Sequence, residues 1–209
     1  KISDNVSAAT KAKNAASFIE VDLDTMKSNL EALLGSTSDD DRATAASEFD
    51  DLYNNINSRA SGANQIVNYQ NVNLIGNTTG PDWDTKTLYT PTNKNGGFTT
   101  LEGAYLGTEH EIVDADGYAW RYEKGNNIYK QYSNDGTNVA TGLEYTATDM
   151  AVQSMDHSDD SVTLSNGTDT ITGTLNRGGL GVLNSEYYSS FADDTAVQEA
   201  IDDIDAAII

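Results

Sequence analysis

The chain of 209 residues contains no cysteine. It can therefore form neither a disulfide framework nor a thiolate metal site, which excludes the cysteine-stapled secreted scaffolds. Long hydrophobic runs are also missing, because no stretch approaches the roughly 20 apolar residues that a membrane-spanning helix needs. No signal peptide opens the sequence. These absences argue against a membrane protein but leave the compartment open.

Basic residues are scarce as well. Twelve lysines and arginines stand against 33 aspartates and glutamates, which gives a formal net charge of −21. Such a surface repels the phosphate backbone, so nucleic acid is not expected as a partner. A strongly negative surface also favours solubility and opposes non-specific association.

Small and apolar residues recur at alternating steps of three and four over most of residues 2–67. This spacing places one narrow apolar seam along a helix, as in coiled coils. The first seam consists of Ile2, Val6, Ala9, Ala12, Ala16, Ile19, Leu23, Met26, Leu30 and Leu33. The second consists of Phe49, Leu52, Ile56, Ala60, Ala63 and Val67. We therefore predict two long helices folded back on each other into an antiparallel, coiled-coil-like rod.

The link between these helices carries its own local signals. Gly35 can adopt the left-handed conformation that ends a helix. Ser38, with Asp41 three residues later, predicts the start of the next helix by a capping box. The acidic triplet Asp39–Asp41 is interpreted as a helix cap rather than a metal site, because acids favour the positive end of a helix dipole.

The character of the chain changes at residue 77, where Gly, Thr, Asn and Tyr become frequent and helical periodicity stops. Alternation over residues 118–123 predicts a strand with one aromatic face, formed by Tyr118, Trp120 and Tyr122. Residues 162–164 and 170–172 predict a hairpin, with Asn166-Gly167 as a tight two-residue turn. The middle of the chain is thus expected to be mainly β.

Helical spacing returns at the C-terminal end, with a capping box from Thr195 to Gln198. The apolar positions there are Val197, Ile201, Ile204 and Ile208. The fold class expected is α+β, a long antiparallel helical rod or bundle with an inserted mainly-β domain. The domains expected are residues 1–76 (rod), 77–185 (β-rich outer domain) and 186–209 (helix returning to the rod). Since the seams reach both termini, helices are expected to continue beyond them.

Asp41-Arg42-Ala43, followed by Glu48 and Leu52, is the first of several local sequences that, in their order along the chain, resemble bacterial flagellin. This stretch is similar to the family's link between two rod helices. The segments 71–76, 173–181 and 200–208 are similar to the stretches that end the first part of flagellins and return to it. The resemblance covers roughly residues 1–76 and 173–209, and the middle would be the family's variable outer domain.

This resemblance implies a structural subunit of the bacterial flagellar filament that assembles for motility. The partners implied are other copies of itself and the flagellar export and capping machinery. The location implied is extracellular, after secretion through the export apparatus without a cleaved signal peptide. The 209-residue chain by itself is expected to be an elongated monomer. The alternatives are the hook–filament junction protein, or a surface adhesin or carbohydrate-binding module on a helical stalk.

Chemical motifs are weak throughout. His110-Glu111 opens a zinc-protease signature, but Asp114 stands where the second histidine is needed. Asp114 to Gly117 resembles the start of a calcium loop but is interpreted as a turn, because the glutamate at the twelfth position is missing. The aromatic strand is interpreted as core rather than as a sugar-binding face. His157 is expected in a surface loop.

We therefore predict no enzyme activity, no catalytic or metal residues and no cofactor. The residues expected to matter are the seam residues Ile19, Leu23, Met26, Leu30, Leu33, Phe49, Leu52, Ile56, Val197, Ile201, Ile204 and Ile208.

Overall fold

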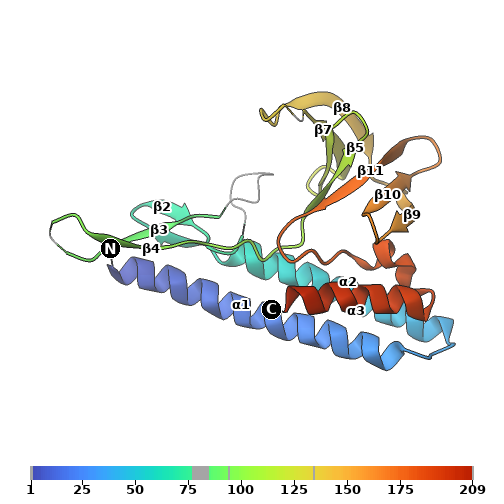
Figure 1. Cartoon of the computed structure of the whole chain (residues 1–209), viewed down its shortest axis with the longest axis horizontal. Helices are drawn as coiled ribbons and strands as arrows, with labels where there is room; N and C mark the ends of the chain where they lie inside the picture. Colours follow the sequence, from blue (N-terminus) through green and yellow to red (C-terminus); the bar gives the residue numbers. More distant parts are fainter. Residues whose placement is uncertain (1, 77–84, 94, 134, 209) are drawn as a thin grey trace.

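The computed structural model describes residues 2–76, 85–93, 95–133 and 135–208. A layer of helices lies below a curled antiparallel sheet, and two small hairpins lie over the N-terminal half of the first helix (Figure 1). The helices are α1 (Ile2–Leu33), α2 (Asp39–Gly62) and α3 (Asp194–Ala207), with a 3₁₀ segment η1 (Ser185–Phe191) before α3. The boundary expected at residue 77 lies outside the described residues.

The strands form one large sheet and two hairpins. The seven-stranded sheet has the order β8-β7-β6-β5-β11-β10-β9, and the hairpins are β1–β2 and β3–β4. The strand bounds are β1 Gln65–Val67, β2 Gln70–Val72, β3 Leu88–Pro91, β4 Phe98–Leu101, β5 His110–Asp114, β6 Ala119–Glu123, β7 Ile128–Tyr132, β8 Ala140–Thr146, β9 Ala151–Asp156, β10 Ser161–Ser165 and β11 Thr170–Arg177.

The prediction of a long coiled-coil-like rod is wrong. The three helices have 32, 24 and 14 residues, and the chain is an α+β protein with a sheet-rich domain. No single partner helix follows α1 along its length. Its N-terminal part contacts β1 and β3, and the rest contacts α2 and α3. Three–four spacing is common to any helix that packs on one face, so it does not by itself specify a coiled coil.

The burial of the individual seam residues follows this division. Ile2 and Val6 are 58% and 59% exposed, so the seam does not extend to the N-terminal turns. Leu52 and Ile208 are half-buried. The structure buries Ile19, Leu23, Met26, Leu30, Leu33, Phe49, Ile56, Val197, Ile201 and Ile204.

One hydrophobic core joins the helices to the sheet, and η1 connects them. Phe49 of α2 packs edge-on against the rings of Tyr188 and Phe191, with centroids 6.0 and 5.1 Å away. The same core continues into the sheet through side chains such as Ile112 and Leu164. Because each of these aromatic rings buries a large apolar area, η1 fixes how the sheet sits on the helices.

The predicted helix cap is found at α2 but not at α3. Ser38 caps α2 by accepting a hydrogen bond from Asp41 N, and Gly35 has φ +79°, as predicted. For α3 the cap is Asp193, whose side chain accepts from Ala196 N, so the capping box predicted from Thr195 is wrong. The last turn of α2 is closed by the buried Asn73, which donates to Ala60 O at 2.7 Å.

The large sheet has to curl. Residues 147–150 alone connect β8 to β9, although these strands form its two opposite edges. Four residues span at most about 18 Å, whereas the edges of a flat seven-stranded sheet would be about 29 Å apart. The strong curvature is visible in Figure 1. Trp120 of β6 stacks on Tyr145 of β8 with ring centroids 4.9 Å apart, which links non-adjacent strands.

The hairpin β10–β11 forms where the sequence predicted it, with Ser165 paired to Thr170. Its turn, however, contains the four residues 166–169 rather than two. Asn166 Oδ1 accepts hydrogen bonds from the backbone N–H groups of Thr168 and Asp169 and so stabilises the turn.

Candidate functional site at the sheet–helix junction

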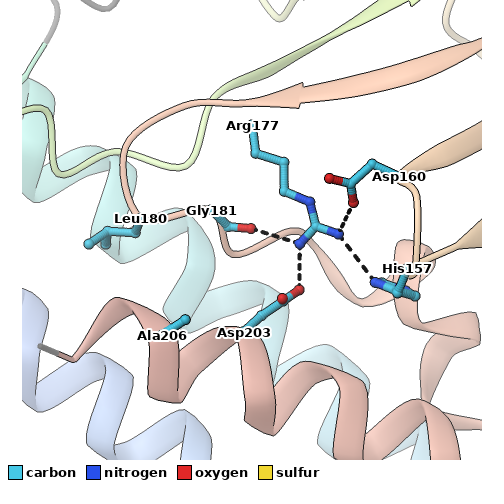
Figure 2. Close-up of a pocket in the computed structure, with 7 residues that line it drawn as sticks. All are labelled: His157, Asp160, Arg177, Leu180, Gly181, Asp203 and Ala206. Atoms are coloured by element: carbon cyan, nitrogen blue, oxygen red, sulfur yellow. Dashed lines mark hydrogen bonds and ion pairs between the residues drawn. The ribbon is translucent and has the colours of Figure 1, made fainter.

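Arg177, the last residue of β11, is the centre of a polar cluster between the sheet and α3. Its guanidinium donates to Asp203 Oδ2 at 2.6 Å and to Gly181 O at 3.1 Å, and forms an ion pair with Asp160. Figure 2 shows these groups converging from β11, from the turn before β10 and from α3. The cluster thus ties the end of β11 and the β9–β10 turn to the returning helix.

His157 completes the cluster in one defined tautomer. Its Nε2 lies 2.9 Å from the backbone oxygen of Tyr187, which can only accept, so Nε2 carries the proton. Its Nδ1 then accepts from Arg177 Nη2 at 3.3 Å. The imidazole ring stacks on Tyr188 with centroids 5.0 Å apart. His157 lies in the turn between β9 and β10, so the expected loop is present, but its side chain is half-buried at the junction.

The two carboxylates in this cluster favour the charged form of Arg177. Burial by itself lowers the pKa of Arg177, but the carboxylates of Asp203 and Asp160 outweigh it and the pKa rises. Asp203 Oδ2 also accepts from Tyr188 Oη at 2.6 Å. Burial raises the pKa of Tyr188 well above its ordinary value, and the charge of Asp203 adds to this rise. Every charged group named here faces an opposite charge or a hydrogen-bond donor.

A second polar cluster joins the three helices at the other end of η1. Arg42, only 8% exposed, donates to Phe191 O at 2.8 Å, to Ser36 O at 2.6 Å and to Asp194 Oδ1 at 2.7 Å. Asp194 also accepts from Gly35 N. Hydrogen bonding from Arg42, and then from Gly35, lowers the pKa of Asp194. Arg42 thus connects the α1–α2 turn to the start of α3.

The chain reaches this cluster through a strained turn. Ser189, Ser190 and Phe191 have φ values of 49°, 49° and 61°, which is left-handed backbone on three consecutive non-glycine residues. Such a conformation costs roughly 1–2 kcal/mol per residue. The complete burial of the Phe191 side chain and the bond from Arg42 to its carbonyl hold the turn in place.

His110, the first residue of β5, is the neighbour of Arg177 in the sheet. It pairs in register with Arg177 across β5 and β11, and its Nε2 is 2.9 Å from Tyr187 Oη. Its Nδ1 is shielded from solvent and has no hydrogen-bond partner among the described residues. Burial lowers the pKa of His110 to about 4, and the positive charge of Arg177 acts in the same direction. This histidine is neutral at physiological pH.

The arrangement holds segments together but offers little for catalysis or ligand binding. The hollow beside Arg177 has a volume of about 240 Å³, below the roughly 300–1,000 Å³ of typical ligand pockets. The polar groups of the cluster line it together with Leu180, Gly181 and Ala206. The guanidinium of Arg177 is already engaged by two carboxylates. Among the residues that the structure describes, no group of three or more histidine, aspartate or glutamate side chains is placed to hold a metal ion.

The other predicted motifs are distributed over the sheet. Asp114 Oδ1 accepts from the backbone N–H of Asp116 and Tyr118, and Oδ2 accepts from Trp120 Nε1, which confirms a turn at this position. Glu111 pairs with Arg121 at 2.7 Å.

The predicted aromatic face of Tyr118, Trp120 and Tyr122 is only partly core. Trp120 is 4% exposed, whereas Tyr118 and Tyr122 are 38% and 47% exposed. Tyr118 lies before the strand, which begins at Ala119.

The junction residues escaped the sequence analysis, although one signal pointed to them. Only four of the twelve basic residues are arginines, and each forms an ion pair with an aspartate or glutamate, three of them across more than 15 residues. Arginine forms such planar, multidentate pairs better than lysine. In a chain this acidic, a rare arginine is a candidate structural anchor.

Comparison with protein-family models, with curated proteins and with solved structures found no match. Within the described ranges, no helix is both long and apolar enough to cross a membrane.

Proposed function

We propose that this chain is a structural subunit of the bacterial flagellar filament, which acts by assembly rather than by catalysis. The observation that carries the proposal is the position of Arg42. It belongs to the Asp41-Arg42-Ala43 stretch that resembles the flagellin link, and it binds Asp194 and Phe191 O at the start of the returning helix. The two distant parts of the chain that the resemblance covers, residues 1–76 and 173–209, thus meet in one helical layer.

The segment around Asn73 gives further support. It is part of the Asn-rich stretch 71–76 that is similar to the end of the first flagellin region. The Asn73 amide donates to Ala60 O, and its Oδ1 accepts from Ile75 N and Gly76 N at 2.9 and 2.8 Å. This side chain therefore ends α2 and turns the chain towards the β region, as a link between an assembly layer and an outer domain requires.

The proposed mechanism is geometric. The sheet stands on one side of the helices (Figure 1), so neighbouring subunits can pack against the helices while the sheet faces solvent. On α1, Phe18 and Val21 are 53% and 57% exposed and supply apolar surface for such contacts. Burying apolar surface between subunits favours association in proportion to its area. Export and capping proteins of the flagellum would be the other partners.

Immunogold electron microscopy of cells that produce the protein tests this proposal. Antibodies are raised against the exposed edge strands β8 and β9, whose side chains are mostly solvent-accessible. The expected result is label along the whole length of flagellar filaments, and loss of both label and filaments when the gene is deleted. Label confined to the base of the filament would support a junction protein instead, and label on the cell surface without filaments would support an adhesin.

A further inference from the structure

A hollow of about 330 Å³ lies between the N-terminal half of α1 and the C-terminal end of α2. Its volume falls within the roughly 300–1,000 Å³ of typical ligand pockets, and it shares no residue with the hollow beside Arg177. On α1, Lys11, Ala15 and Phe18 line it, and their spacing of four and three residues places them on one face of the helix. Gly62 and Ala63 line it from the side of α2.

Much of this lining is apolar and open. Phe18 is 53% exposed, whereas Ala63 is almost completely buried. A Cβ atom at Gly62 would meet no atom within 4 Å, so the glycine leaves free space beside the ring and the small side chains. Covering exposed apolar surface with an apolar ligand is favourable in proportion to the area removed from water.

The two cations that line the hollow are compensated differently. Arg59 donates from Nε to Asp22 Oδ2 at 2.5 Å and from Nη2 to Asp22 Oδ1 at 3.3 Å. The same guanidinium lies over the Phe18 ring, 5.0 Å from its centroid. Lys11 donates to the uncharged Asn64 O at 2.6 Å, and in the part of the chain that the structure describes no carboxylate pairs with it. One positive charge is therefore left over, at Lys11.

These features give the hollow a direction. Lys11 and Phe18 are seven residues apart on α1, which corresponds to about 10 Å along a helix axis. The uncompensated ammonium group lies at one end, and the aromatic ring with the neutralised Arg59 lies at the other. A complementary ligand therefore carries one negative charge at one end of an apolar chain of similar length.

We propose that this hollow binds an unbranched aliphatic monocarboxylate of about six to eight carbons. The carboxylate pairs with Lys11, and the chain lies along Ala15 and Gly62 towards Phe18. The net charge of −21 opposes this only weakly at physiological ionic strength, because screening over ~8 Å limits the effect of distant acidic groups. The inference goes beyond the proposed function and does not depend on it.

Nuclear magnetic resonance of the whole 15N-labelled chain tests the binding. The chain is titrated with butanoate, hexanoate and octanoate at neutral pH and constant ionic strength. We expect amide shifts centred on Lys11, Phe18 and Gly62, with dissociation constants in the millimolar range for ligands of this size. Affinity should rise by up to about fourfold for each added CH₂ group. The uncharged 1-hexanol should bind several-fold more weakly than hexanoate.

Two variants with matched controls locate the ligand. Gly62→Leu fills the hollow without a clash at Cβ and should abolish the shifts, whereas Gly125→Leu, at an equally open turn between β6 and β7, should leave binding unchanged. Lys11→Met should lower the affinity for hexanoate to that for 1-hexanol, whereas Lys13→Met, at a nearby exposed position outside the hollow, should not. Unchanged amide signals from the sheet verify that each variant is folded.

Several results would overturn the proposal. Shifts that do not increase with chain length would indicate a general salt effect. Equal affinities for hexanoate and 1-hexanol would show that the charge of Lys11 contributes nothing. Shifts that persist in Gly62→Leu would place the ligand elsewhere. Shifts of the same amides on dilution of the protein alone would assign the hollow to a second copy of the chain instead.

Discussion

Acidification should loosen the junction between sheet and helices through His110. The pKa of this histidine falls from its ordinary 6.5 to about 4 in the folded protein. Between these values the unfolded chain binds a proton that the folded chain does not. The contribution of His110 to the free energy of unfolding is therefore complete above pH 6.5. It is lost as the pH falls from 6.5 towards 4.

The magnitude follows from the same shift. Each pKa unit corresponds to about 1.4 kcal/mol, so the shift of His110 represents roughly 3 kcal/mol of unfolding free energy across this interval. The geometry explains the direction, because a protonated ring would place its charge in an interior site next to Arg177, its partner in the β5–β11 register. That amount is a sizeable fraction of the stability of an ordinary domain.

The assay is urea unfolding at a series of pH values between 7.5 and 4, with the variant His110→Gln measured in parallel. Glutamine cannot be protonated in this range but can still form a hydrogen bond to Tyr187 Oη. Carboxylates with lowered pKa values, such as Glu123 and Asp194, destabilise both proteins equally as they protonate. The natural chain should therefore lose about 3 kcal/mol more than the variant. Parallel stability curves would refute the reasoning.

Three further predictions concern packing, the junction and charge. Leu30→Ala and Phe49→Ala should each cost roughly 2–5 kcal/mol in chemical denaturation, whereas the exposed Glu31→Ala should change stability by less than about 0.5 kcal/mol; similar effects for all three would contradict the burial assignments. Arg177→Met should cost about 2–3 kcal/mol by leaving two carboxylates without their partner. The matched change Lys124→Met, at an exposed position, should cost almost nothing. Equal losses in thermal or urea unfolding would contradict the stabilising role of the Arg177 cluster. Added salt should promote lateral association of copies, because screening shortens to ~8 Å near physiological ionic strength and weakens repulsion between acidic surfaces; light scattering that is independent of salt would contradict this.

Features of short range could be predicted because the interacting residues are close in sequence. The cap of α2 by Ser38, the left-handed Gly35 and the turn at Asp114 all depend on groups within four residues of one another. At α3, three consecutive residues can serve as caps. The choice of Asp193 depends on where η1 anchors Phe191, and that is a tertiary effect.

The polar junction could not be predicted in this way. Arg42 and Asp194 are 152 residues apart in the sequence, and Arg177 and Asp203 are 26 apart. Residue types alone do not indicate which carboxylate of 33 an arginine will meet. The scarcity of arginine is a signal for these positions that the sequence analysis did not use, and it does not identify their partners.

Composition and periodicity by themselves determined that the chain is strongly acidic, free of cross-links, helical at both ends and mainly β in the middle, because charge and amphipathic spacing are properties of the residues and their order. Only the tertiary structure decided what covers each apolar seam. On α1, the hairpins, α2 and α3 share that role, so a spacing shared with coiled coils yields a mixed helical layer beneath a curled sheet. The physical reason is that a seam specifies how much apolar surface must be buried, and many different partners can bury it.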